Sequence, residues 1–449
     1  MPRPTRFGPL AATALAMLLP GMSLAQQYVP SRDAHTPGEH FTPNIHVASH
    51  IPLGAPLTVA DIEIEQELDR PYAYVARRLV GGFDLISLED PDDAEVIYRW
   101  RIENAELHQG SGPMDVKYFK LDGRYYLILS VQFRGGGPSG GLGAIVFDVT
   151  SLPDTSGIRE VGRIEAPEFP GGFHNIFAYK HSNGRPLLFA TTAGPYANVY
   201  DLGYVLEGRS DDALVARVPV PTSQAIPGSR GYHDFYTGYH ADSEQDRFYG
   251  GGTGGYYVYN ITDLENPELL VSLTGIRGVE RGHTFTPSPD GRYVIAETEY
   301  QYAPLRIFDL KPGLDGEVAN INRPISAWTA NWEHLVHNHE VRWPFVFVSG
   351  YVDGLQVFTL SDPKNPKTIA HYYTYLEGGD GDGGVMNGAW GVDVRNADGL
   401  IVISDMVTGL WAFRMEGFNG WNGLDWGYPN ISSVQDWENG PAYQARSRN

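Results

Sequence analysis

Hydrophobic and polar residues alternate with a period of two along most of the chain, and the short apolar runs end at Gly, Asp or Pro. Successive side chains of a strand point to opposite faces, so this alternation predicts β-strands. The repeated segments show no apolar stripe at helical spacing, and the 53 glycines and 32 prolines of the chain supply many turns. The chain is therefore expected to be all-β.

One sequence unit recurs seven times, at spacings typical of a propeller blade. The weaker copies lie at 124–154, 185–202, 292–310 and 399–415, and the clearest ones are RPYAYVARRLVGGFDLISLEDPDD (70–93), DRFYGGGTGGYYVYNITDLENPE (246–268) and WPFVFVSGYVDGLQVFTLSDPKNP (343–366). The last unit lacks an obvious fourth strand, whereas NIHVASHIPL (44–53) is a strand without a unit. Pairing the two hides both open edges. We therefore predict a single seven-bladed β-propeller over 44–416, closed by its N-terminal strand.

The two ends of the chain differ from the repeats. Residues 1–25 resemble an export signal, with Arg3 and Arg6 before the apolar run LAATALAMLLPGM and a small-x-small site at 23–25. We expect a periplasmic or secreted protein with an arm at 26–43. The tail at 417–449 is expected to pack outside the ring or to be partly disordered. No later run is long and apolar enough to span a membrane.

Charge and composition narrow the range of partners. The formal net charge is −21 over 449 residues, which disfavours nucleic acid and anionic membranes. Cys is 0, so disulfides, thiolate nucleophiles and cysteine-held metals are excluded. Any metal must be held by His, carboxylates, amides or Met. We expect a monomer that takes a small-molecule substrate or a protein or glycan ligand.

Histidine recurs at the start of the first strand of consecutive units. Aligned as ADIEI, MDVKY, HNIFA, HDFYT, HTFTP, HEVRW and WGVDV, four adjacent units place histidine first, at His174, His233, His283 and His339. The first strand of a blade lines the channel, so four imidazoles are expected along one arc of its rim. His337 lies two residues before His339, on the same side of an extended strand, and is a candidate fifth ligand.

Two interpretations of these histidines remain open. Imidazoles without a thiolate suit Cu²⁺, with zinc or iron as alternatives. A structural histidine copied by duplication, or a ring that binds ordered water, would give the same pattern.

Carboxylates near the rim are further candidates. The second strand returns to the rim, where Glu297, Glu299 and Asp405 lie. Glu297 and Asp405 are candidate general bases or positioning groups, although for each one taken separately a solvated loop charge is the favoured interpretation. Asp234 and Glu340 follow rim histidines and are expected to turn towards a neighbouring blade. The first strands then hold too few carboxylates for a metal-dependent lactonase or lyase.

A glycine-rich loop offers one more candidate site. GGDGDGG (378–384) contains Asp380 and Asp382 but lacks the spaced ligands of a calcium loop, so a turn is favoured.

The segments YVDGLQVFTLSDPKNP, GGFDLISLEDPDD and YYVYNITDLENPE resemble the LVIVD-repeat family. This resemblance implies an extracytoplasmic propeller. More distantly, a histidine-bearing propeller is similar to the selenium-binding protein family, whose methanethiol oxidase members are copper proteins; the present chain departs from it by having no cysteine. Two functions follow as hypotheses. One is a copper-dependent oxidoreductase acting on small molecules, and the other is a non-enzymatic binding or scaffold propeller.

Overall fold

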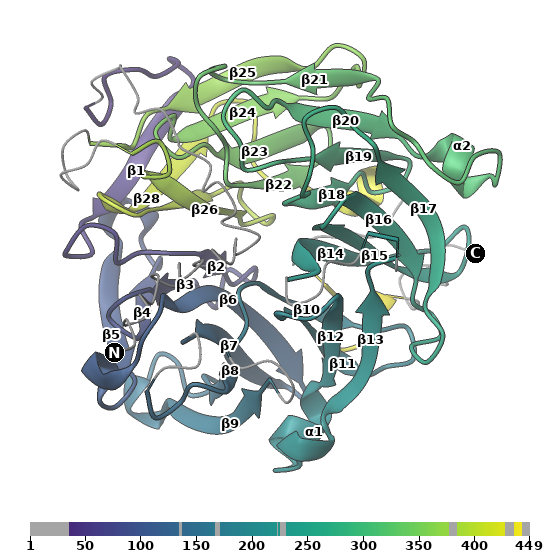
Figure 1. Ribbon diagram of the computed structural model, residues 1–449. Coiled ribbons are helices and arrows are strands. Elements are labelled where there is room, and N and C mark those ends of the chain that lie inside the picture. Colours follow the sequence, from purple (N-terminus) through teal and green to yellow (C-terminus); the bar gives the residue numbers. More distant parts are fainter. Residues whose placement is uncertain are drawn as a thin grey trace, which may run out of the picture.

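Seven four-stranded antiparallel sheets surround a central channel in the described part of the computed structural model (Figure 1). The structure describes residues 36–133, 137–166, 171–221, 223–224, 230–376, 384–426 and 435–441. The fold is therefore the predicted seven-bladed β-propeller. The predicted signal peptide at 1–25 lies outside the described residues, as do Asp380 and Asp382 of the glycine-rich loop.

The first four blades follow chain order from the channel outwards. Blade 1 contains β2 (Ile62–Ile64), β3 (Tyr72–Arg77), β4 (Gly82–Ser87) and β5 (Glu95–Arg101). Blade 2 contains β6 (Gly112–Leu121), β7 (Arg124–Gln132), β8 (Leu142–Asp148) and β9 (Arg159–Glu165). Blade 3 contains β10 (Ile176–Lys180), β11 (Pro186–Thr191), β12 (Tyr196–Asp201) and β13 (Leu214–Pro219). Blade 4 contains β14 (Tyr232–His240), β15 (Gln245–Gly252), β16 (Gly255–Asn260) and β17 (Glu268–Thr274).

The last three blades complete the ring. Blade 5 contains β18 (Phe285–Pro287), β19 (Tyr293–Ala296), β20 (Leu305–Asp309) and β21 (Ser326–Trp328). Blade 6 contains β22 (Asn338–Arg342), β23 (Phe345–Ser349), β24 (Leu355–Thr359) and β25 (Lys367–Tyr372). Blade 7 contains β26 (Ala389–Val394), β27 (Ile401–Asp405), β28 (Gly409–Met415) and, from the other end of the domain, β1 (Ile45–Ile51).

The N-terminal strand closes the ring as predicted. β1 pairs antiparallel with β28, from Ile45 opposite Met415 to Ile51 opposite Leu410. A bulge between Val47 and Ser49 interrupts the ladder. Because β1 takes the outer place of blade 7, the last sheet is completed by a segment from the opposite end of the chain, which removes the open edge of β28.

Helices are short and peripheral in the described residues. α1 (Leu202–Leu206) follows β12, and Asp201 caps it by accepting hydrogen bonds from the N–H groups of Gly203 and Tyr204. α2 (Lys311–Leu314) follows β20. Single 3₁₀ turns lie at Pro91–Asp93, Ala105–Leu107, Thr155–Gly157, Ser210–Asp212 and Gly423–Trp426. None of the helices in this part of the chain is long and apolar enough to cross a membrane.

The hydrophobic core lies between neighbouring blades. The alternating strands bury Val, Ile, Leu and aromatic side chains on both faces, because each sheet packs against a sheet on either side. Aromatic pairs join the blades: the ring centroids of Phe83 and Phe147 are 5.1 Å apart, and those of Phe189 and Phe248 are 5.9 Å apart. This packing holds the channel-lining strands in fixed register to one another.

The described parts of the arm and the tail contact the ring. The arm runs beside blade 6, where Phe41 forms a bridge with Tyr372. In the tail, the indole N–H of Trp421 donates to the carbonyl of Trp343, and the side chain of Gln435 bonds to the backbone of β10. Trp343 and the end of β10 belong to first-to-second-strand connections, so the tail lies away from the rim where the channel-lining strands begin.

Candidate metal site at the channel mouth

Four imidazole rings from four consecutive blades lie side by side at one mouth of the channel. The ring centroids of His174 and His233 are 4.7 Å apart, those of His233 and His283 are 4.1 Å apart, and those of His283 and His337 are 5.2 Å apart. The four rings form one continuous arc. Trp390 of blade 7 extends this arc, with its ring centroid 4.1 Å from that of His337.

The structure corrects the alignment of blade 6. His339 pairs with Val348 of β23, in the position where β18 places Phe285 opposite Ala296 and β10 places Ile176 opposite Ala190. The residue equivalent to His174, His233 and His283 is therefore His337, two places earlier than the sequence alignment indicates. On the remaining blades this position holds Ala60, Met114 and Trp390.

His339 lies one layer deeper, where the other blades carry apolar residues. Its side chain is 2% exposed, and neither ring nitrogen has a hydrogen-bond partner within the part of the chain that the structure describes. Burial lowers the pKa of His339 to about 3, so its ring is neutral. His339 does not share in the arc of ring contacts at the mouth.

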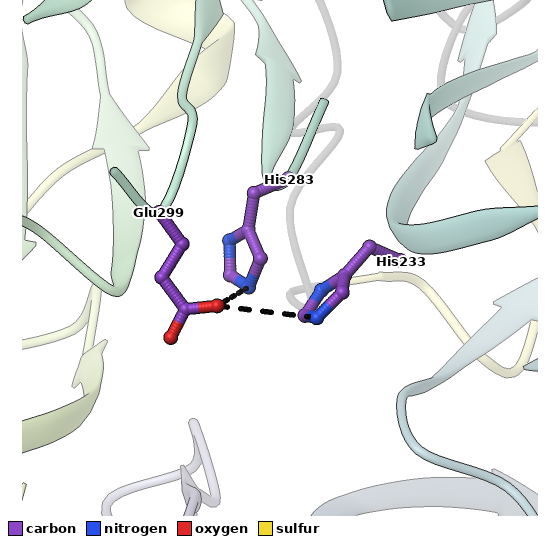
Figure 2. Close-up of side chains that lie close together, drawn as sticks. All are labelled: His233, His283 and Glu299. Atoms are coloured by element: carbon purple, nitrogen blue, oxygen red, sulfur yellow. Dashed lines mark ion pairs between the residues drawn. The ribbon is translucent and has the colours of Figure 1, made fainter. Parts of the chain in front are cut away.

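His233, His283 and Glu299 form a group with the geometry of a metal site (Figure 2). Their three ligand atoms all lie within 4.8 Å of one another. Oε2 of Glu299 is 3.7 Å from Nε2 of His283 and 4.0 Å from Nε2 of His233. Figure 2 shows the carboxylate and the two rings pointing towards the same space. Two imidazoles and a carboxylate are a ligand set that binds zinc, copper or iron.

Hydrogen bonds fix the orientation of three of the four rings. Nδ1 of His283 is 2.5 Å from Oε2 of Glu297, Nδ1 of His337 is 2.7 Å from the carbonyl oxygen of Trp390, and Nδ1 of His174 is 3.1 Å from Oε1 of Gln132. Each partner is an acceptor, so Nδ1 carries the proton and donates it. On a neutral ring, a proton on Nδ1 leaves Nε2 with a lone pair, which is the form in which histidine binds a metal.

Electrostatics separates His283 from its neighbours. Burial lowers the pKa of His174, His233 and His337, and nearby cationic groups add to the effect. Burial alone would also lower the pKa of His283, but the carboxylates of Glu297, Glu299 and Asp234 together outweigh burial and raise that pKa to about 9. Burial raises the pKa of Glu297 to about 7. In the metal-free protein, His283 and Glu297 therefore hold a proton between them.

Glu299 is positioned by a residue that the sequence did not single out. The hydroxyl of Tyr351 donates to Oε1 of Glu299, which leaves Oε2 facing the imidazoles. Tyr351 is fully buried and has a φ of 47°, a conformation that bulky residues rarely adopt. No local sequence signal identifies Tyr351, because it belongs to blade 6 and Glu299 follows the second strand of blade 5.

Gly251 makes room for the backbone of His283. A Cβ at this position would lie 1.7 Å from the carbonyl oxygen of His283. A larger residue here would displace the strand that carries His283. The glycine run of β15 thus has a packing role at the mouth.

The two catalytic candidates predicted from the sequence have different surroundings. Glu297 is fully buried and contacts His283 directly, which fits the predicted orienting role. Asp405 is also fully buried, and its oxygens accept hydrogen bonds from the hydroxyl of Thr374 and the N–H groups of Val407 and Thr408. These contacts assign Asp405 to the turn after β27 rather than to the histidine arc.

Carboxylates line the channel below the mouth, contrary to the sequence-based expectation. They surround a cavity of about 40 Å³ and comprise Asp61, Glu63, Asp115, Asp234, Glu340 and Asp393. Asp234 and Glu340 were expected to turn towards a neighbouring blade. Asp234 does so, since its Oδ2 accepts a hydrogen bond from the hydroxyl of Thr284 on blade 5, and it also borders the cavity. Glu340 instead reaches across it and accepts a hydrogen bond from the hydroxyl of Tyr236 on blade 4. The alternation rule failed here because adjacent residues at a narrow axis can both border the same space.

These deeper carboxylates have partners inside the protein. The Lys117 ammonium is 2.7 Å from Asp115, 3.2 Å from Asp61 and 3.6 Å from Glu63. Arg342 contacts Glu340 at 2.7 Å and Asp393 at 3.4 Å. The channel interior is thus an internal ion-pair network. Lys117 and Arg342 lie among these carboxylates, where a metal ion would otherwise bind in an acidic channel.

No protein-family model matches the chain, and no curated protein matches it. The site therefore rests on its own geometry: a β-propeller whose channel mouth holds a His/Glu group able to bind a metal.

Proposed function

We propose that the channel mouth binds one transition-metal ion, with copper preferred and zinc or iron as alternatives. His233, His283 and Glu299 would supply the ligand atoms, because these three groups converge. His174 and His337 flank them in the same arc and are candidates for further ligands. Among divalent first-row transition metals, Cu²⁺ binds a given set of nitrogen ligands most tightly, which supports copper at a site of imidazoles without thiolate.

The single observation that carries the proposal is the set of acceptors behind the rings. A buried carboxylate, a backbone carbonyl and a side-chain amide each hold an Nδ1 proton, on three different blades. A histidine with a purely structural role needs a hydrogen bond at one ring nitrogen, and it gains no stability from having its other nitrogen face those of neighbouring histidines. Here Nε2 of His283 is buried and has no hydrogen-bond partner among the described residues. Leaving such a polar atom unpaired costs about 1–3 kcal/mol unless a ligand takes it.

We further propose that the protein is exported and oxidises small molecules. The N-terminal sequence and the resemblance to LVIVD repeats support export, and the distant resemblance to a family with copper oxidases supports oxidation. A bound copper ion would supply one-electron chemistry. The chain's own residues contribute orientation: Glu297 holds the proton on His283, and Tyr351 holds one oxygen of Glu299.

The test is elemental analysis of full-length protein purified without a histidine tag, after loading with Cu²⁺, Zn²⁺ or Fe²⁺ in turn. We expect about one ion per chain and the tightest retention for copper. Electron paramagnetic resonance of the copper form should show nitrogen coupling from imidazoles. Absence of stoichiometric metal under all three conditions would refute the site and favour the binding or scaffold propeller. Metal without oxidation of thiols or phenols would keep the site and remove the oxidase.

A further inference from the structure

Two large aromatic side chains are exposed next to each other on the mouth side of blade 5. Tyr302 is 47% exposed and Trp332 is 54% exposed. Their ring centroids are 6.2 Å apart, and the ring planes are inclined at 59°. The two rings contact each other but leave much of their surface open to solvent. Adjacent aromatic rings that are exposed to solvent leave apolar surface in contact with water, and such surfaces commonly mark a binding site.

The backbone holds this aromatic pair in place. Tyr302 has a φ of 61°, the left-handed region that bulky residues avoid. Its N–H donates to the carbonyl of Trp332 at 3.2 Å, and the side-chain amide of Gln301 donates to the carbonyl of Glu333 at 2.7 Å. Two hydrogen bonds thus join the two loops. A strained conformation that is maintained by such contacts is a reason to look for function.

Both loops lead directly into the proposed metal site. Tyr302 follows Glu299 by three residues, and Trp332 precedes His337 by five. The first loop connects β19 to β20 and the second connects β21 to β22, so both lie on the face where the channel-lining strands begin. A molecule held between these rings would lie beside the mouth.

The size and shape of the pair indicate its ligand. A fully buried aromatic side chain covers about 150–250 Å², so two half-exposed rings offer about 200 Å². A stable protein interface needs about 800 Å² on each partner. A sugar would stack on one flat face, whereas two rings inclined at 59° suit a planar ring that stacks on one and meets the edge of the other.

We infer that Tyr302 and Trp332 bind the ring of a small phenolic compound, and that such phenols are the substrates of the proposed metal site. The assignment of substrate rests on the proposed function, whereas the binding of a ring does not. The flanking residues support a small, neutral ligand: Gln301 is half-buried, and Glu333 is exposed and acidic. An anionic aromatic compound should therefore bind less well than a neutral phenol.

The experiment compares three variants of the full-length protein. Trp332→Ala removes one ring, and Tyr302→Asn removes the other while keeping a residue that tolerates positive φ. Trp426→Ala is the matched control, since Trp426 is 43% exposed in the tail, which contacts the ring away from the mouth. Calorimetric titration with 4-methylphenol, and separately with methyl glucoside, is carried out on metal-free and copper-loaded protein.

We expect 4-methylphenol to bind about fivefold more weakly to each ring variant and more than about tenfold more weakly to the double variant. Trp426→Ala should bind as the wild type does, and metal content should be unchanged in all variants. Unaltered phenol binding in the double variant would overturn the inference, as would no phenol binding by the wild type or preference for the glucoside. Phenol binding that depends on the two rings in a protein without metal affinity would support the aromatic site and refute the proposed function alone.

Discussion

The mouth and the interior of the same channel treat polar side chains differently. At the mouth, imidazoles from four blades lie side by side, and three of them have an acceptor behind Nδ1. In the interior, the carboxylates contact Lys117 or Arg342 or accept hydrogen bonds from backbone N–H groups, and burial raises the pKa of Glu63, Asp115 and Asp393. The interior groups have partners within the chain, whereas at the mouth Nε2 of His283 has no hydrogen-bond partner among the described residues. Polar residues alone do not mark a site; the pairing of each atom does.

The strongest test of this difference removes two imidazoles at the mouth. The double variant His233→Ala, His283→Ala should lose metal affinity on the order of a thousandfold, because two of three converging ligands are gone. The metal-free variant should still fold, since blade packing supplies most of the stability, but should melt at a somewhat lower temperature because the buried Glu297 loses its partner. Elemental analysis and thermal melting measure the two effects. One bound ion per chain in this variant would contradict the site.

The matching test breaks the interior network. Lys117→Met should destabilise the fold by about 3–5 kcal/mol at neutral pH, because Asp61, Glu63 and Asp115 lose their common cation. Metal affinity per folded molecule should remain unchanged. Urea unfolding followed by circular dichroism gives the free energy. The loss should shrink in acid, where the carboxylates become protonated; a variant as stable as the wild type would show that the network has no such role.

A milder change addresses the acceptor behind His283. Glu297→Gln keeps the size of the side chain but removes its charge, and should weaken metal binding about 10- to 100-fold. Competition with a chelator of known affinity measures this. Thr298→Ala, one residue further along, is the control and should bind metal as the wild type does. Equal affinity in Glu297→Gln would mean that the carboxylate does not orient the ring.

The pH dependence follows from the same pair. The pKa of His283 is raised to about 9, so a proton must leave before its Nε2 lone pair can bind a metal at neutral pH. Affinity should therefore rise by about tenfold per pH unit from pH 7 towards pH 9. The contribution of the His283–Glu297 pair to the free energy of unfolding of the metal-free protein follows the opposite trend. This contribution is fully present below pH 6.5 and is lost as the pH rises through 9. In Glu297→Gln, the pH dependence of metal affinity and that of stability should both weaken. Metal affinity that does not change with pH in the wild type would contradict a proton held between His283 and Glu297.

The smallest expected effect separates His339 from His337. His339→Val places an apolar side chain where other blades have one, and removes two buried nitrogens without partners. We expect stability to rise by about 1 kcal/mol and metal affinity to change by less than about twofold. His337→Val should instead reduce metal affinity. The same chelator competition checks both, and loss of metal in His339→Val alone would restore the sequence-based register.

The pair His337 and His339 shows where sequence reasoning stops. Strand alternation has a period of two, so a shift of two residues leaves every side chain on the same face. The pattern around HNHEV therefore fits either register equally well. Only the pairing of His339 with Val348 decides that His337 is the mouth residue. The same limit explains Asp234 and Glu340, which alternation directs aside although both border the channel cavity.

The sequence by itself determined the features that repeat along the chain. Seven units, an unpaired strand at 44–53 and histidine near the start of four first strands are local patterns, and duplication makes each visible several times. The tertiary structure decided what these residues meet. Glu299 with Tyr351, His174 with Gln132 and Lys117 with Asp61 are contacts between blades. Such contacts depend on how independently formed sheets are brought together around the axis, which no local period records. The propeller was therefore predictable from alternation and repetition, whereas the composition of the candidate metal site required the closed ring.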